Sequence, residues 1–131
     1  MDSVFGTYRR WNNIAGWFMF LFSTIVYTLT VEPTVSFWDC GEFILSAFRL
    51  QVGHPPGAPL FLMIGRIATL FAGGDGAKVA LTMNMLSAVC SAFAIMFLFW
   101  TITHLVRRVY TRNTPLQTGH IPAIIGSGII G

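Results

Sequence analysis

"WNNIAGWFMFLFSTIVYTLTV" (residues 11–31) contains no charged side chain over 21 positions. A helix rises about 1.5 Å per residue, so this run is long enough to cross a bilayer core of about 30 Å. Residues 79–106 form a second run, of 28 positions without Asp, Glu, Lys or Arg. Only 10% of the residues are charged, and the mean hydropathy is +0.67. These values predict an all-α integral membrane protein with two complete transmembrane helices.

A third apolar run covers residues 121–131 and is only 11 residues long. We interpret it as the start of a truncated third transmembrane helix, which makes the chain the N-terminal fragment of a multi-pass protein. A cleaved signal peptide is the other interpretation of the N-terminus. The first apolar run is long for a signal peptide, and no small-x-small cleavage site follows it.

The arginines indicate the orientation of the chain in the membrane. Two of them (residues 9–10) precede the first predicted span, and three (Arg107, Arg108 and Arg112) follow the second. All acidic residues except Asp2 lie between the spans. The positive-inside rule therefore places the N-terminal ten residues and the segment 107–120 in the cytoplasm, and the loop between the spans outside. The net charge of +3 reports this orientation, and no nucleic-acid partner is predicted.

The outer loop, residues 32–78, is predicted to contain two amphipathic helices. Ser36 is expected to cap a helix over about 37–50, which "VGHPPG" ends. A second helix is expected over about 58–72, lying at the membrane surface because Arg66 interrupts its apolar run. The alternative is that residues 60–71 span the membrane, which would reverse the orientation of everything after them.

The first predicted loop helix places Asp39 and Glu42 three positions apart, on one helical face. His54 follows in a proline-rich turn, and Arg66 supplies a cation suited to phosphate oxygens. Two carboxyl groups and an arginine suit the transfer of a sugar from a phosphate leaving group. They would also suit a divalent metal bridging to phosphate, but no ligand spacing indicates one and no cofactor is predicted. The simpler interpretation is two solvated carboxylates, with a salt bridge to Arg49 or Arg66.

Three motifs follow in order: "DCGEF" at 39–43, "HPPGAPLF" at 54–61 and "NMLSA" at 84–88. Together they resemble the start of the protein O-mannosyltransferase-like membrane family, which includes bacterial proteins of unknown function and an animal enzyme of the endoplasmic reticulum. In the more distant classical protein O-mannosyltransferases the two acids are adjacent, whereas here Cys40 and Gly41 separate them.

The resemblance implies the N-terminal part of a GT-C-type helical bundle. It also implies a polyprenyl-phosphate-linked, mannose-like donor and a protein hydroxyl acceptor on the outer face. Asp39 would be the base of an inverting transfer and Glu42 the second catalytic carboxylate. The implied substrate contacts are His54, Arg66 and Asn84.

Two other classes of function stay open from the residues: a transporter or flippase of lipid-linked glycans, and a non-catalytic membrane assembly module. The expected location is the bacterial cytoplasmic membrane, with membrane lipid as a partner. Two complete spans are too few to enclose a GT-C active site, so this chain alone is expected to be inactive.

Overall fold

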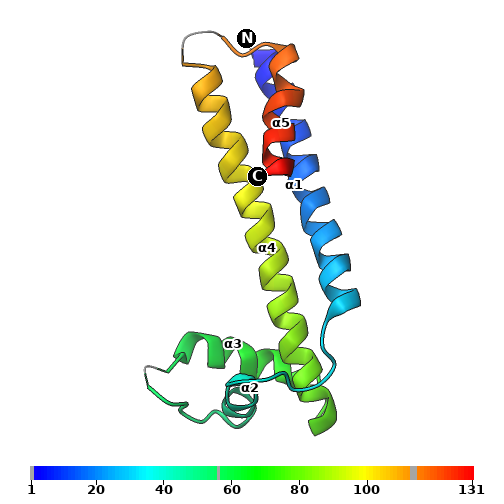
Figure 1. Ribbon diagram of the computed structural model, residues 1–131, viewed down its shortest axis with the longest axis vertical. Coiled ribbons are helices and arrows are strands. Elements are labelled where there is room, and N and C mark those ends of the chain that lie inside the picture. The colour runs from blue at the N-terminus through cyan, green and yellow to red at the C-terminus, as the bar shows by residue number, and fades with distance from the viewer. Residues whose placement is uncertain (1, 56, 113–114) are drawn as a thin grey trace. The chain divides into compact units, whose positions relative to one another are not determined.

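The computed structural model describes residues 2–55, 57–112 and 115–131. Within these ranges the chain is helical and has no strand, as predicted. Figure 1 shows two long helices and several short ones. The elements in chain order are α1 (Asp2–Thr30), α2 (Cys40–Arg49), α3 (Pro59–Leu70), α4 (Gly76–Tyr110), the 3-10 helix η1 (Thr118–His120) and α5 (Ile121–Ile130).

Helices α1 and α4 are both long and apolar enough to cross a membrane. Their most apolar stretches are only 11% and 22% buried within the protein. The core helix of a soluble protein would bury such residues, whereas large apolar side chains such as Phe18 and Leu29 are exposed here. An apolar exterior of this kind suits lipid contact, because a helix satisfies its own backbone hydrogen bonds. Helices α3 and α5 are apolar but shorter.

The chain forms two compact units. The first combines Met1–Val26 with Ser91–Gly131. In this unit the Tyr8 hydroxyl donates to the Thr103 carbonyl at 3.4 Å, and the Trp100 indole donates to the Asn12 carbonyl at 3.3 Å. Helix α5 packs in the same unit, where Ile124 is fully buried.

The second unit, Tyr27–Cys90, contains the three motifs. Helices α2 and α3 pack against each other and against the first turns of α4 around a small apolar core that includes Ala47 and Met83. Gly65 allows this close approach. A Cβ atom at Gly65 would lie 3.0 Å from the Ala47 Cβ and 2.8 Å from the Met83 Cε. A larger side chain there would push the helices apart.

Helix α2 is shorter than the sequence predicted, and the expected cap at Ser36 is wrong. The helix begins at Cys40, with Asp39 at its N-cap position and no side-chain capping bond. Trp38 has a φ of +65°, and this left-handed conformation prevents the helix from extending back to residue 37. At the other end Leu50 is also left-handed, and the N–H groups of Leu50 and Gln51 bond to the last turn.

The other helices differ from the predicted ranges only at their ends. Helix α3 covers Pro59–Leu70 where 58–72 was expected, and α4 extends the predicted span 79–106 in both directions. Helix α1 starts well before residue 11. Part of the predicted cytoplasmic loop 107–120 is therefore helical. Membrane orientation and the outer position of residues 32–78 stay predictions.

The orientation predicts which introduced thiols react from outside the cell. In a background with Cys40→Ser and Cys90→Ser, we expect Gln51→Cys to react with a membrane-impermeant maleimide in intact cells. Gln51 is exposed in the turn after α2, so the label can reach it. The matched variant Arg112→Cys, after α4, should react only once the membrane is permeabilised. The reverse pattern would contradict the predicted orientation.

Candidate active site

Asp39 stands at the start of α2 with an exposed side chain. Its backbone carbonyl accepts the Phe43 N–H at 3.0 Å. Its carboxylate forms no hydrogen bond or ion pair with any residue that the structure describes. The partial positive charge of a helix N-terminus favours an anion at this position. Asp39 therefore offers a carboxyl group that is free to act on a ligand.

Glu42, in contrast, uses both carboxylate oxygens on His54. Oε1 accepts the His54 backbone N–H at 2.7 Å, and Oε2 lies 2.8 Å from the ring Nδ1. The turn that carries His54 is closed by a 2.9 Å bond from the Gly57 N–H to the His54 carbonyl. Glu42 thus ties this turn to the first turn of α2. The structure brings the predicted residues Glu42 and His54 into direct contact.

The two groups shift each other's pKa. The pKa of Glu42 is lowered from 4.5, mainly by the His54 backbone N–H and then by the His54 ring. The pKa of His54 is raised from 6.5, first by its hydrogen bond to Glu42 and then by the Glu42 charge. The Asp39 carboxylate adds a smaller upward effect on the pKa of His54. Asp39 therefore acts electrostatically on the same cluster, although no bond joins it to the pair.

These shifts predict how the turn depends on pH. Because its pKa is lowered, Glu42 stabilises the folded state at pH values above its ordinary pKa. This stabilisation is lost as the pH falls through the lowered pKa. Because its pKa is raised, His54 stabilises the folded state at pH values below its ordinary pKa. This stabilisation is lost as the pH rises through the raised pKa. The ion pair should therefore stabilise the turn fully between pH 4.5 and 6.5. The hydrogen bond from the backbone N–H remains above this window.

Titration of the His54 ring by NMR measures this coupling. We expect a His54 midpoint above 6.5 in the unaltered protein and a fall toward 6.5 in Glu42→Gln. Glu32→Gln is the matched control, since the Glu32 carboxylate bonds to Thr34 and not to His54. A midpoint that Glu42→Gln leaves unchanged would show that the pair does not form in solution.

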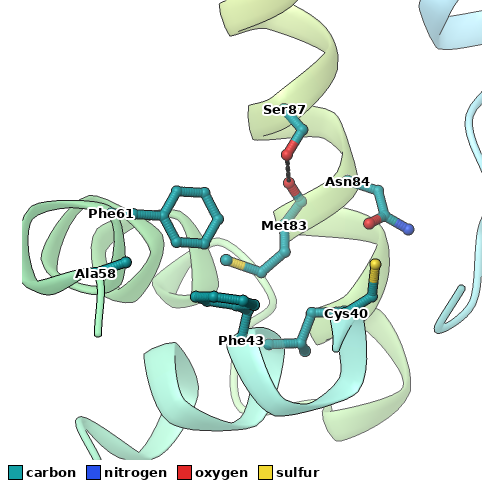
Figure 2. A pocket seen from close by; sticks show the side chains of 8 residues that line it. Cys40, Phe43, Ala58, Phe61, Met83, Asn84 and Ser87 are labelled. Atoms are coloured by element: carbon teal, nitrogen blue, oxygen red, sulfur yellow. Dashed lines mark hydrogen bonds between the residues drawn. The ribbon is translucent and has the colours of Figure 1, made fainter. Parts of the chain in front are cut away.

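A pocket of about 310 Å³ opens beside the start of α2. Figure 2 shows Phe43, Phe61 and Met83 pointing toward one another from α2, α3 and α4, with Cys40 and Asn84 to one side. The Phe43 and Phe61 rings meet edge to face at 5.9 Å. The full lining is Cys40, Phe43, Ile44, Ala58, Phe61, Met83, Asn84 and Ser87. Apolar walls with a few polar groups are typical of small-molecule sites.

All three sequence motifs contribute to this pocket. "DCGEF" supplies Cys40 and Phe43, "HPPGAPLF" supplies Ala58 and Phe61, and "NMLSA" supplies Asn84 and Ser87. Neither phenylalanine is among the site residues predicted from the sequence. Each is the last residue of its motif, and that shared position is the signal by which they could have been found. Segments far apart in the sequence therefore meet at one cavity next to Asp39.

Asn84 has a second contact that orders the approach to α2. Its Nδ2 donates to the Glu32 carbonyl at 2.7 Å and to the Thr34 carbonyl at 3.0 Å. The side chain thereby fixes the segment between α1 and α2 onto α4. Both donor hydrogens are used in this way, so Asn84 offers a ligand only its amide oxygen. Its predicted contact with substrate stays a prediction.

Arg66 does not lie with the acids. Its Nη1 donates to the Phe48 carbonyl at 2.6 Å, at the C-terminal end of α2. Asp39 lies nine residues before Phe48 in the chain, which corresponds to about 14 Å along a helix. Among the described residues the ion pairs are Glu42–His54 and Asp75–Lys78, so the alternative salt bridges to Arg49 or Arg66 are not formed there. The donor-phosphate role of Arg66 stays a prediction.

Comparison with known proteins gives a family match. Residues 39–131 match the family described as "Protein O-mannosyl-transferase TMEM260 N-terminal domain". The "Protein O-mannosyl-transferase tmem260" of Dictyostelium discoideum is 34% identical over 84 residues, which are 64% of this chain and 10% of the relative. The "Protein O-mannosyl-transferase TMEM260" of Mus musculus is 40% identical over 81 residues, which are 61% of this chain and 11% of the relative.

These matches confirm the resemblance that the three motifs indicated. The chain spans about a tenth of the length of these two curated relatives. No solved structure matches it significantly.

Proposed function

Because the chain belongs to the protein O-mannosyl-transferase TMEM260 N-terminal domain family, we propose that it forms part of a membrane glycosyltransferase. This enzyme transfers a mannose-like sugar from a polyprenyl-phosphate donor to a protein hydroxyl. One observation carries the proposal: the three motifs line a single pocket, and Asp39 directly precedes Cys40 in its wall. The names of the two relatives support the transfer of mannose to a protein.

Asp39 is the proposed general base. As the acceptor hydroxyl oxygen attacks the anomeric carbon, its proton passes to the Asp39 carboxylate. The bond between the anomeric carbon and the phosphate oxygen breaks, and the phosphate leaves with the electron pair. A single displacement of this kind inverts the anomeric centre. The free carboxylate of Asp39 supports this role, since a general base must reach the proton that it removes.

Glu42 and His54 are proposed to act as one unit. Glu42 holds His54 through Nδ1, and the other ring nitrogen, Nε2, has no partner among the described residues. A protonated His54 can then donate a hydrogen bond from Nε2 to an oxygen of the lipid-linked sugar, and its positive charge favours binding of the phosphate. Glu42 orients this group and, by raising the pKa of His54, favours its charged form. Its role is therefore closer to positioning than to proton transfer.

The proposed setting is a multi-pass GT-C-type bundle with the pocket on the outer face of a membrane, the bacterial cytoplasmic membrane being the expected one. A lipid-linked donor presents its phosphate at headgroup depth. The exposed apolar surfaces of α1 and α4 support a membrane location for the site. Because the chain spans about a tenth of its relatives, we expect activity only from the full-length protein.

The donor class can be tested directly. Full-length protein in liposomes, given an acceptor protein, should transfer mannose from polyprenyl-phosphate mannose and not from nucleotide-linked mannose. Transfer from the nucleotide sugar would contradict the proposed donor. Movement of the lipid-linked sugar across the bilayer with an unmodified acceptor would indicate a flippase instead.

A further inference from the structure

A second pocket, of about 480 Å³, lies at the opposite end of α2 from Asp39. Its polar groups come from Arg49, the last residue of α2, and from Arg66 and Thr69 on α3. The full lining is Phe48, Arg49, Arg66, Thr69, Leu70, Gly73 and Gly74. The proposed sugar-transfer steps at Asp39, Glu42 and His54 do not use this pocket.

The two arginines are fixed on a shared aromatic ring. Each guanidinium carbon lies 5.7 Å from the centre of the Phe48 ring. One guanidinium nitrogen of Arg66 donates a hydrogen bond to the Phe48 carbonyl. The other N–H groups of Arg66 remain available to a ligand. Arg49 forms no hydrogen bond within the described part of the chain. A planar guanidinium that is already positioned binds phosphate oxygens in a bidentate way.

The positive charge of this pocket is not neutralised by acids. Neither Arg49 nor Arg66 pairs with a carboxylate among the described residues. Asp75 follows the two glycines in the chain, but it lies 3.4 Å from Lys78 and also accepts the Ala77 N–H. An open pocket with two unpaired guanidinium groups attracts an anion.

The surroundings of the pocket are those of a membrane surface. Helix α3 exposes a large apolar area. Met63, Ile67 and Leu70 are all more than half exposed, as is Phe71 directly after the helix, and Leu70 also forms part of the pocket wall. A helix that combines such a face with arginines lies in the interface, with the arginine heads at the phosphate layer. The pocket is also open, because a Cβ atom at Gly73 or Gly74 would meet nothing within 4 Å.

We propose that the Arg49–Arg66 pocket binds the phosphate of an anionic membrane phospholipid, whose acyl chains lie along α3. The lipid anchors the α2–α3 pair at the membrane surface. In this arrangement Arg66 contacts a resident lipid and not the sugar donor. The donor phosphate that reacts must lie no farther from Asp39 than the length of one sugar ring. Lipid binding at this pocket does not itself require sugar transfer.

Lipid binding can be measured without any activity assay. The purified protein in neutral detergent is titrated with short-chain phosphatidylglycerol, and bound lipid is counted by native mass spectrometry. We expect Arg49→Gln/Arg66→Gln to weaken binding about tenfold, as expected for losing charge-assisted hydrogen bonds. The matched double variant Arg10→Gln/Arg112→Gln removes the same charge elsewhere and should change affinity less than about twofold.

Two further arms make the test decisive. Arg49→Gln alone should weaken binding severalfold with an unchanged circular dichroism spectrum, which separates lipid contact from folding. Inorganic phosphate should not displace the lipid at similar concentration, because it lacks the acyl chains. Equal competition by inorganic phosphate would overturn a lipid as the ligand. Equal losses of lipid affinity in the two double variants would show that this pocket is not the lipid-binding site.

Discussion

Asp39→Asn is expected to lower the rate of sugar transfer by the full-length protein about 10²–10⁴-fold, the usual contribution of general-base catalysis. The amide keeps the size of the side chain but cannot accept the hydroxyl proton. Donor affinity should not fall, because the substitution removes a negative charge that would repel the phosphate, and one charge near an exposed site changes affinity only modestly. Steady-state kinetics with varied donor therefore should show a fall in kcat with a nearly constant donor KM.

Asp75→Asn is the matched control for this substitution. Asp75 is also exposed and also starts a helix, and its amide form keeps the oxygen that accepts the Ala77 N–H. Its kcat should stay close to that of the unaltered protein. If Asp39→Asn raised the donor KM and left kcat unchanged, Asp39 would be a donor-binding residue and not the base.

Glu42→Ala is expected to lower transfer about 10²-fold, because a misplacement of about 1 Å in a catalytic group costs roughly that much. The change removes both bonds to His54, at 2.7 and 2.8 Å, and leaves its turn untied from α2. Glu42→Gln should recover most of the rate, since an amide oxygen can still accept the backbone N–H. The kcat values of the two variants, measured in parallel, test this difference.

A double-mutant cycle separates this pairing from a general loss of folding. If Glu42 acts through His54, Glu42→Ala should cost little more in a His54→Ala background. Thr34→Ala is a suitable control, because it removes a hydroxyl that donates to Glu32 and, among the described residues, does not contact the Glu42–His54 pair. Independent, additive losses from Glu42→Ala and His54→Ala would contradict the proposal that the two residues act as a unit.

The helices could be predicted from the sequence because their signals are local. Uncharged runs of sufficient length identify α1 and α4, and the proline and glycine residues around His54 separate α2 from α3. The start of α2 could not be predicted in this way. It depends on the left-handed backbone of Trp38, a conformation that non-glycine residues rarely adopt and that no residue type in "SFWDC" indicates.

Candidate site residues could be named from the sequence, and their roles stay predictions, but their arrangement could not be predicted. The three motifs identified Asp39, Glu42, His54 and Asn84, yet spacing alone placed the two acids together on one helical face. Instead Glu42 turns to His54, twelve positions away, while Asp39 keeps a free carboxylate. Contacts across such distances depend on how α2, α3 and α4 pack. The approach at Gly65 that allows this packing has no signature in the sequence.

The most direct measurement is a single-turnover assay on full-length protein that is preloaded with polyprenyl-phosphate mannose and then mixed with acceptor. It isolates the chemical step from donor binding and product release. With membrane levels matched, Asp39→Asn should transfer sugar about 10²–10⁴-fold more slowly than both the unaltered protein and Asp75→Asn. A single-turnover rate for Asp39→Asn within about threefold of the unaltered protein, far from that expected loss, would show that Asp39 is not the base.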